Sequence, residues 1–580
     1  NSTKESIFIE KNKLKIIPLG GLGKIGRNMM AIEYENDIII VDCGTQFANE
    51  STPGVGHIIP NIDYLLARKD RIKAYLITHA HEDHVGGLPF ILPLLPAPIV
   101  SAKFSIEFIK KKFLEYKFNT QPVFKEINPD NNDRLRIGQF VVEFVRVVHS
   151  IPDACMVVID TPVGKVINTG DWRFDDSVYM GPKANKERIK AIGDSGVALL
   201  MCDSTSCDYL GASRKETEIA DNLNDLLHKL DHNRVFVSLF SSQINRIQMV
   251  ADIAIKSGRK LALLGRSIVS NVELSLKHGF LNFPENLLVT DRNLDNLKNQ
   301  RIIVICTGSQ GEEHAVLTKM VTGKHPQVKL DHNDAVVLSS SMIPGNEGKI
   351  WEMIDGLFYS GVKVYIDSLR DFDNFGCIHV GGHGHQDEII EMINLVRPKY
   401  FLPIHGGGHH LFHNAENAIK AGLSRDKIFV IKNGQSLELT NQNNEQVIKL
   451  GEKVTSGVIY LDSNNKNVLT QQDISERREL AQNGLVYISL TFSKKTGQIL
   501  VKPVIKSKGF YGLDQNSILI KELQTLIVEL AVNRDSSLPP DSLALRLPFG
   551  VAREHLRRQR FRAGVGALAG RAAERVDVGH

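Results

Sequence analysis

A cluster of metal-ligating residue types stands in one short stretch of the chain. Residues 78–84 read THAHEDH, directly after the apolar run AYLI, and hold His79, His81, Asp83 and His84. Imidazole nitrogens and carboxylate oxygens are ligands that suit zinc and manganese, and a turn at the end of a strand lets all four side chains face one point. A polar turn in solvent is the alternative, but it does not account for this spacing after a buried strand. We therefore predict a metal site here.

Three further candidate ligands follow, each at the end of an apolar run. His149 follows FVVEFVRVV, Asp171 follows KVINTG and His405 follows KYFLPI. A single histidine at a strand end is more often an ordinary core or surface residue. An ordered series behind the first cluster, however, is what the strands of a layered α/β protein would deliver to one edge. We therefore expect these three residues to complete two metal sites together with the first cluster.

The elements that must position these residues form several domains. Short strands separated by turns are expected over residues 1–208, and alternating strands and helices predict a second, parallel-sheet domain over 209–368. The first domain resumes over 369–438. The rise of Asn and Gln in TNQNNEQ predicts a linker over 439–456, and a small α/β domain with an Arg/Ala-rich tail is expected over 457–580.

Composition limits the class of protein. The chain has 580 residues, 42% of them hydrophobic and 23% charged, which is ordinary for a globular protein of several domains. No apolar run is long enough to cross a bilayer, and the first residues lack a secretory signal, so we expect a cytoplasmic protein. Six cysteines without a CxxC pair predict neither disulfides nor cysteine-bound zinc. A net charge of +4 does not by itself indicate nucleic-acid binding.

The ligand series resembles a known superfamily. HxHxDH, then His149, then Asp171 in TGD, is similar to the motif order of the metallo-β-lactamase superfamily, whose fold is an αββα sandwich. Asp42 in IIIVDCG matches an earlier aspartate that supports the metal cluster in that family. The resemblance implies two Zn²⁺ ions per chain, with Mn²⁺ or Mg²⁺ as alternatives. It assigns His79, His81 and His149 to one ion, Asp83, His84 and His405 to the other, and Asp171 to both.

The long insert between Asp171 and His405 resembles the β-CASP domain of nucleic-acid processing enzymes. Asp203 in MCDST, His383 in HVGGHG and His405 in PIHG match motifs of that group. Longer phrases, PLGGLGKIGRN, CTGSQGE, SSSMIPGNE and HVGGH, are similar to the ribonuclease J family. The implied fold class is α/β: a metallo-β-lactamase sandwich with an inserted β-CASP domain and a small C-terminal α/β domain.

That resemblance implies a metal-dependent ribonuclease of RNA maturation and decay, with 5′-to-3′ exonuclease and endonuclease activity on single-stranded RNA that carries a 5′ monophosphate. Family members assemble as homodimers or homotetramers. The implied catalytic residues are Asp83, Asp203 and His383, with His383 protonating the leaving 3′ oxygen. The implied substrate-binding residues are Ser241, Ser242, Gln243, His379, Val380, Gly381, Gly382 and His383. A DNA nuclease of the same fold and an inactive RNA-binding scaffold are the alternatives.

Several features depart from the family pattern or have a plainer explanation. Gly381 stands where the family has serine, which removes a possible phosphate donor. The GxGxxG run at 21–26 leads into a strand, so we do not expect a dinucleotide site. His409, His410 and His413 are expected to begin a helix. Arg246 either lies near phosphate or is a solvated charge. The arginine-rich segment Arg553–Arg562 is expected to add nothing to catalysis.

Overall fold

The computed structural model describes residues 12–49, 51–116, 122–289, 301–343, 345–443, 445–464, 467–493, 499–509 and 517–532. The chain divides into two compact units. Residues 1–47 and 55–468 belong to the first, and residues 48–54 and 469–580 to the second. All the predicted site residues lie in the first unit.

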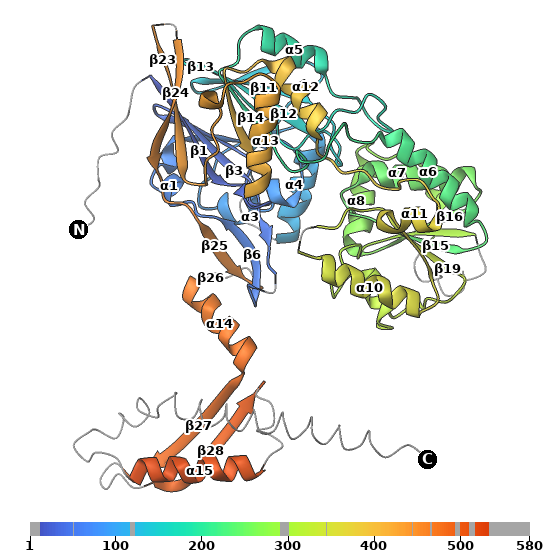
Figure 1. Ribbon diagram of the computed structural model, residues 1–580, viewed down its shortest axis with the longest axis vertical. Coiled ribbons are helices and arrows are strands. Elements are labelled where there is room, and N and C mark those ends of the chain that lie inside the picture. The colour runs from blue at the N-terminus through green and yellow to red at the C-terminus, as the bar shows by residue number, and fades with distance from the viewer. Residues whose placement is uncertain are drawn as a thin grey trace. The chain divides into compact units, whose positions relative to one another are not determined.

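Two sheets pack face to face in the first unit (Figure 1). Successive side chains of a strand point to opposite faces of its sheet, and both faces are buried. Ile39 and Val41 lie in the core between the sheets, whereas Ile38 and Ile40 face the outer helices. The first sheet runs β24 (Glu445–Lys453), β23 (Gln435–Gln442), β1 (Lys13–Gly20), β3 (Met29–Tyr34), β4 (Asp37–Val41), β7 (Ile72–Leu76), β8 (Ile99–Ser101), β9 (Phe124–Glu126). The second runs β10 (Arg134–Ile137), β11 (Phe140–Arg146), β12 (Cys155–Thr161), β13 (Gly164–Asn168), β14 (Leu199–Asp203), β21 (Tyr400–Ile404).

Helices cover the outer face of each sheet. Ile109 and Phe113 of α4 pack on the first sheet, and Ile189 of α5 and Met392 of α12 pack on the second. This is the predicted αββα order of layers. The helices on these faces are α1 (Asp63–Leu66), α2 (Glu82–Val85), α3 (Leu88–Ile91), α4 (Lys103–Tyr116), α5 (Lys186–Asp194), α12 (Gln386–Val396) and α13 (Gly408–Lys420).

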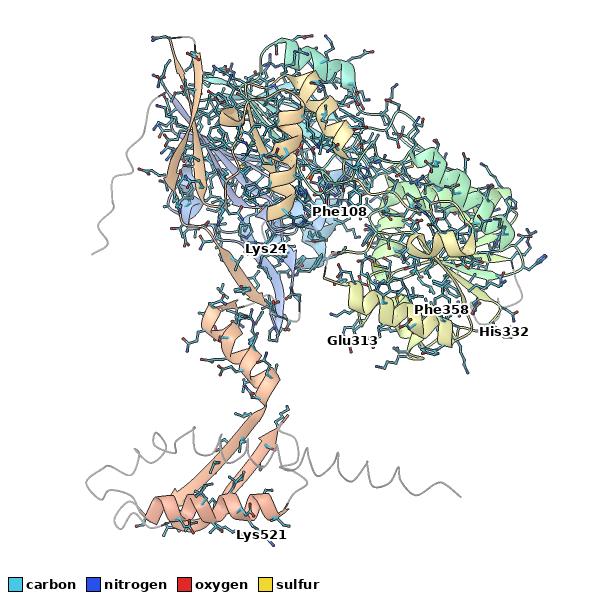
Figure 2. The ribbon with its side chains drawn as sticks, viewed as in Figure 1. Lys24, Phe108, Glu313, His332, Phe358 and Lys521 are labelled. Atoms are coloured by element: carbon cyan, nitrogen blue, oxygen red, sulfur yellow. The ribbon has the colours of Figure 1, made fainter. Side chains whose placement is uncertain are left out.

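The insertion forms a parallel sheet of its own with helices on both faces (Figure 1). The sheet runs β17 (Leu288–Val289), β16 (Lys260–Leu264), β18 (Ile302–Cys306), β15 (Arg234–Ser238), β19 (Asp334–Leu338), β20 (Lys363–Ile366). Its helices are α6 (Glu216–Lys229), α7 (Ile244–Lys256), α8 (Arg266–Lys277), α9 (Val316–Val321) and α10 (Glu347–Tyr359), and α11 (Arg370–Asp373) follows β20. Phe108 of α4, labelled in Figure 2, packs against both the core of the insertion and the core beside the first sheet.

The chain then returns to the sandwich. β21 pairs in parallel with β14, and Asp203 lies opposite Ile404. This register brings the end of β14 beside His405, which follows β21. β22 (Gly406–Gly407) pairs with β2 (Leu22–Gly23). The GxGxxG run at 21–26 leads into β3, as predicted.

The predicted linker over 439–456 is wrong. β23 and β24 form an antiparallel pair there, and Leu437, Leu439 and Ile448 are buried between the sheets. The polar Asn441 and Gln442 are exposed at the end of β23, so the local composition reflects a hairpin end. The second unit resumes at residue 469 and not at the expected residue 457. β25 (Val458–Asp462) pairs with β6 (Val55–Pro60) inside the first unit. β6 pairs in turn with β5 (Gln46–Phe47).

The second unit contains α14 (Gln471–Asn483), β27 (Leu485–Phe492), β28 (Ile499–Lys508) and α15 (Ser517–Val532), with β27 and β28 antiparallel. Thr470 caps α14 by accepting the N–H of Asp473. The segment Arg553–Arg562 lies outside the described residues. In the part of the chain that the structure describes, no helix is long and apolar enough to cross a membrane.

Candidate metal centre

The seven predicted ligands meet at one edge of the sandwich, beyond the ends of β7, β11, β13 and β21. They form two groups, and within each group the ligand atoms lie within 4.8 Å of one another. Asp171 belongs to both groups, which is the arrangement needed to share one carboxylate between two ions. The first group is His79, His81, His149 and Asp171, and the second is Asp83, His84, Asp171 and His405.

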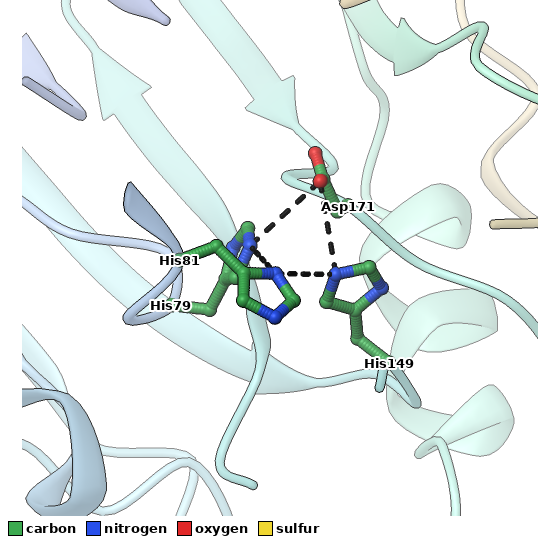
Figure 3. Close-up of side chains that lie close together, drawn as sticks. All are labelled: His79, His81, His149 and Asp171. Carbon is green, nitrogen blue, oxygen red and sulfur yellow. Dashed lines mark hydrogen bonds and ion pairs between the residues drawn. The ribbon is translucent and has the colours of Figure 1, made fainter. Parts of the chain in front are cut away.

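Three imidazoles converge in the first group (Figure 3). Nδ1 of His81 lies 3.1 Å from Nε2 of His79 and 3.0 Å from Nε2 of His149. Burial lowers the pKa values of His79 and His149 well below the ordinary histidine value, and lowers the pKa of His81 to about 4. The rings are therefore neutral at pH 7. Neutral imidazole nitrogens that face one another fit a cation placed between them.

The second ring nitrogens of His79 and His149 are each held by another residue. Nδ1 of His79 lies 3.0 Å from Oγ1 of Thr78, and Nδ1–H of His149 donates to the carbonyl oxygen of Gly382 at 2.7 Å. A Cβ at Gly382 would lie 2.2 Å from that Nδ1, so only glycine permits the contact. Such bonds fix which nitrogen of each ring faces a metal.

The second group joins carboxylates to two further rings. Nε2 of His84 lies 3.2 Å from Oδ1 of Asp171, and Nε2 of His405 lies 3.1 Å from Oδ2 of Asp83. Burial raises the pKa of Asp171, but the rings of His405 and His84 outweigh it and lower that pKa to about 2. Oδ1 of Asp171 is buried and has no hydrogen-bond donor of acceptable geometry among the described residues. An ionised, buried oxygen of this kind fits a metal ligand.

Two residues that support the centre have left-handed backbones. Asp42 has a φ of 60° and His405 a φ of 50°, in a region that non-glycine residues rarely adopt and that often marks functional sites. Oδ2 of Asp42 accepts Nδ1–H of His84 at 2.7 Å, and Oδ1 accepts the backbone N–H of Thr78 at 2.9 Å. Asp42 therefore positions the loop that carries four of the ligands.

Asp203 joins the metal centre to His383. Its Oδ2 lies 2.7 Å from Nδ1 of His383, and its Oδ1 lies 3.1 Å from Nδ1 of His405. Burial raises the pKa of Asp203, but the rings of His383 and His405 outweigh it and hold that pKa well below the ordinary value. The carboxylate is therefore ionised and only accepts. For His383, burial lowers the pKa, and the charge of Asp203 outweighs it, so the net shift is upward.

The predicted substrate-binding residues come from two segments that lie side by side. Ser241, Ser242 and Gln243 follow β15 and precede α7. Ile244 of α7 and Val380 pack in the same core cluster. Gln243 is buried, and Gly381 is exposed with nothing within 4 Å of a built Cβ.

Arg246 is buried, so of its two alternatives the solvated charge is wrong. Its guanidinium donates to the carbonyl oxygen of Ile378 at 2.9 Å and to Glu216 at 3.2 Å. It therefore fixes the backbone next to His379. Burial, with the charge of Arg246 adding to it, lowers the pKa of His379 to about 3.

Some residues at the centre were not singled out from the sequence. Nδ2 of Asn28 donates to the carbonyl oxygen of Asp83 at 3.1 Å and to its Oδ2 at 3.2 Å, and Oγ1 of Thr205 lies 2.7 Å from Nδ1 of His405. The sequence motif PLGGLGKIGRN, which resembles the ribonuclease J family, ends on Asn28 and could have identified that residue.

The three later histidines lie on the first turns of α13, as expected: His409, His410 and His413.

Comparison with known proteins agrees with this geometry. Four family models match: metallo-β-lactamase superfamily over 22–214, ribonuclease J β-CASP domain over 232–357, Zn-dependent metallo-hydrolase RNA specificity domain over 377–427, and ribonuclease J C-terminal domain over 473–546. A solved structure of a protein of unknown function from Enterococcus faecalis has a TM-score of 0.51 at 16% identity, covering 75% of this chain and 100% of its own, and supports the fold alone.

Curated relatives match over most of their length. Ribonuclease J 1 of Streptococcus pyogenes is 34% identical over 92% of this chain and 93% of its own. Ribonuclease J of Thermus thermophilus is 34% identical over 90% of this chain and 89% of its own. Ribonuclease J2 of Bacillus subtilis is 32% identical over 89% of this chain and 90% of its own. The chain therefore belongs to the ribonuclease J family.

Proposed function

We propose that this chain hydrolyses RNA phosphodiesters as a 5′-to-3′ exonuclease and an endonuclease, leaving a 5′ phosphate on the product. One observation carries the proposal: two ligand groups share Asp171, and His383 lies beside them on the carboxylate of Asp203. This arrangement joins a two-metal site to a positioned proton donor. The complete ligand set argues against an inactive scaffold, and ribonuclease relatives across the chain argue against a DNA nuclease.

The residues fit two Zn²⁺ ions, with Mn²⁺ or Mg²⁺ as alternatives. His79, His81 and His149 would hold one ion, Asp83, His84 and His405 the other, and Asp171 both. Neutral imidazoles and an ionised carboxylate are the donor set that zinc prefers. Two bound divalent cations supply a water of lowered pKa and stabilise charge on the phosphoryl oxygens.

The protein's own groups handle the leaving group. A departing 3′ alkoxide needs a proton, and an imidazole in hydrogen-bond reach supplies one best when its pKa is near the working pH. His383 fits this role because Asp203 raises its pKa, which keeps the ring protonated at higher pH. Asp203 acts as a positioning residue, since its two oxygens orient His383 and His405 together. Asp83 would act as a metal ligand in the second group.

The RNA strand follows the segments beside the centre. We assign the terminal 5′ phosphate to the turn from His379 to His383 and to Ser241, Ser242 and Gln243. Backbone N–H groups of a glycine-rich turn can bind an anion where a side-chain donor is lacking. Single-stranded RNA with a 5′ monophosphate is the expected substrate, and a homodimer or homotetramer in the cytoplasm the expected form.

The test uses one RNA and the DNA of matched sequence, each labelled at either end and carrying a 5′ monophosphate. We expect the RNA alone to be shortened from its 5′ end, with 5′-phosphorylated products, in the presence of Zn²⁺ or Mn²⁺. Equal cleavage of the DNA, or products with a 3′ phosphate, would contradict the proposal. A 5′-triphosphate RNA should be degraded more slowly, because the added phosphates do not fit a pocket built for one.

A further inference from the structure

An exposed aromatic side chain stands on the loop after β14. Tyr209 is 61% exposed and its neighbour Leu210 is 81% exposed. The ring of Tyr209 stacks on that of His385, with centroids 5.2 Å apart and planes inclined by 23°. One face of the tyrosine ring is thus supported, and much of the ring is left open.

The loop is held in place from two sides. The N–H of Gln386 donates to the carbonyl oxygen of Tyr209 at 3.0 Å, which ties the loop to the start of α12. From α13, Nδ2 of Asn417 donates to the carbonyl oxygen of Cys207 at 2.8 Å. A ring that is ordered before binding loses little conformational entropy when a ligand packs on it.

Short segments of the chain connect the ring to the proposed proton donor. Tyr209 follows Asp203 within one short loop, and its stacking partner His385 lies two residues beyond His383. Asp203 and His383 are themselves joined at 2.7 Å. The chain segments on both sides of this bond therefore continue directly into the stacked pair.

We propose that Tyr209 is a stacking platform for one nucleobase of the RNA strand next to the cleaved bond. The inference rests on the ribonuclease activity proposed above and adds a binding subsite to it. Every nucleobase has a π-face, so the subsite accepts any base and requires the strand to be unpaired there. The supported ring of Tyr209 binds the base, and His385 holds the ring from the opposite face.

Abasic substitution tests the subsite directly. A set of 5′-monophosphate RNAs, each with a single abasic nucleotide at a successive position around one defined cleavage site, is cleaved by the metal-loaded wild type and by Tyr209→Ala and Tyr209→Phe. At one position the missing base should lower kcat/KM of the wild type by roughly 5- to 150-fold, the size of one base–aromatic stack. Tyr209→Ala should lose a similar factor on intact RNA and become insensitive to that abasic position. Tyr209→Phe should behave as wild type.

Tyr359→Ala is the matched control, because Tyr359 is 93% exposed on α10 of the insertion. It should leave both kcat/KM and the abasic profile unchanged. Thermal unfolding and metal content of each variant show that the fold and the metal centre are intact. A Tyr209→Ala enzyme that keeps the full position-dependent abasic penalty overturns the subsite. A wild type that cleaves all abasic RNAs equally also overturns it while the ribonuclease activity stands, and a wild type that cleaves no RNA overturns both.

Discussion

Nδ1 of His383 lies 2.7 Å from Oδ2 of Asp203, and the other oxygen of the same carboxylate faces His405 at 3.1 Å. One carboxylate thus orients a candidate proton donor and a candidate metal ligand. Proton donation and metal binding can therefore be separated by mutation, because removing His383 leaves the contact between Asp203 and His405 in place.

Replacing His383 by alanine should lower kcat for RNA cleavage by roughly 10²- to 10⁴-fold, the usual contribution of a positioned general acid. Metal content should stay at the wild-type value, because His383 is outside the seven proposed ligands, although its ring also forms a group with Asp171, Asp203 and His405 whose ligand atoms lie within 4.8 Å of one another. Single-turnover cleavage and elemental analysis of the same preparations test both statements. Loss of metal together with activity would reassign His383 to the metal centre.

The pH dependence of kcat should report on Asp203. His383 must be protonated to act, and Asp203 raises its pKa, so kcat should hold at low pH and fall as the pH rises through that raised pKa. In Asp203→Asn the charge is gone, the pKa of His383 drops, and the falling limb should move to lower pH. Profiles are compared at equal metal content, because Asp203 also contacts His405. A limb at an unchanged pH would show that another group donates the proton.

His81→Ala should reduce both bound metal and activity. Nδ1 of His81 is within 3.1 Å of two other ring nitrogens, so its loss removes the centre of the first ligand group. Elemental analysis after dialysis is the measurement. The control is His278→Ala, which removes a partly exposed histidine of the insertion. Two metals per chain and full activity in His81→Ala would exclude His81 from the ligand set.

Gly381→Ser should improve substrate binding without harming the fold. A Cβ at Gly381 meets nothing within 4 Å, so we expect a change in stability of no more than about 0.5 kcal/mol. A new hydroxyl donor to the 5′ phosphate is worth about 1 kcal/mol, which corresponds to a roughly 5-fold lower KM with kcat unchanged. Gly382→Ser is the contrasting variant and should destabilise the protein, because its Cβ would lie 2.2 Å from Nδ1 of His149. An unchanged or higher KM in Gly381→Ser would remove this turn from the phosphate site.

The ligand set could be predicted from local pattern, and the layers of the fold followed from the resemblance of these motifs to the metallo-β-lactamase superfamily. His149, Asp171 and His405 each follow an apolar run, and strands of one sandwich bring such ends together. The partners that orient these rings could not be predicted in the same way. The carbonyl oxygen of Gly382 that accepts Nδ1–H of His149 lies 233 residues away along the chain.

The wrong linker over 439–456 and the wrong alternative for Arg246 have one cause. The linker and a solvated Arg246 were both considered because each segment was judged by its own composition. Distant partners decide both: Glu216 pairs with Arg246, and Leu439 pairs with Leu14 across β23 and β1. Tertiary packing overrides local preference wherever it buries apolar surface or pairs a charge.

The most direct test of the central claim is a metal titration of RNA cleavage. Metal-free protein, prepared with a chelator, receives Zn²⁺ in steps, and the initial rate on 5′-monophosphate RNA is measured at each step alongside bound metal. Metal-free protein should not cleave, and the rate should rise to a plateau at two bound ions per chain. Asp171→Ala should bind less metal and stay inactive over the whole titration, because both ligand groups need Asp171. Full cleavage by metal-free protein, or an active Asp171→Ala, would contradict a two-metal ribonuclease centred on these residues.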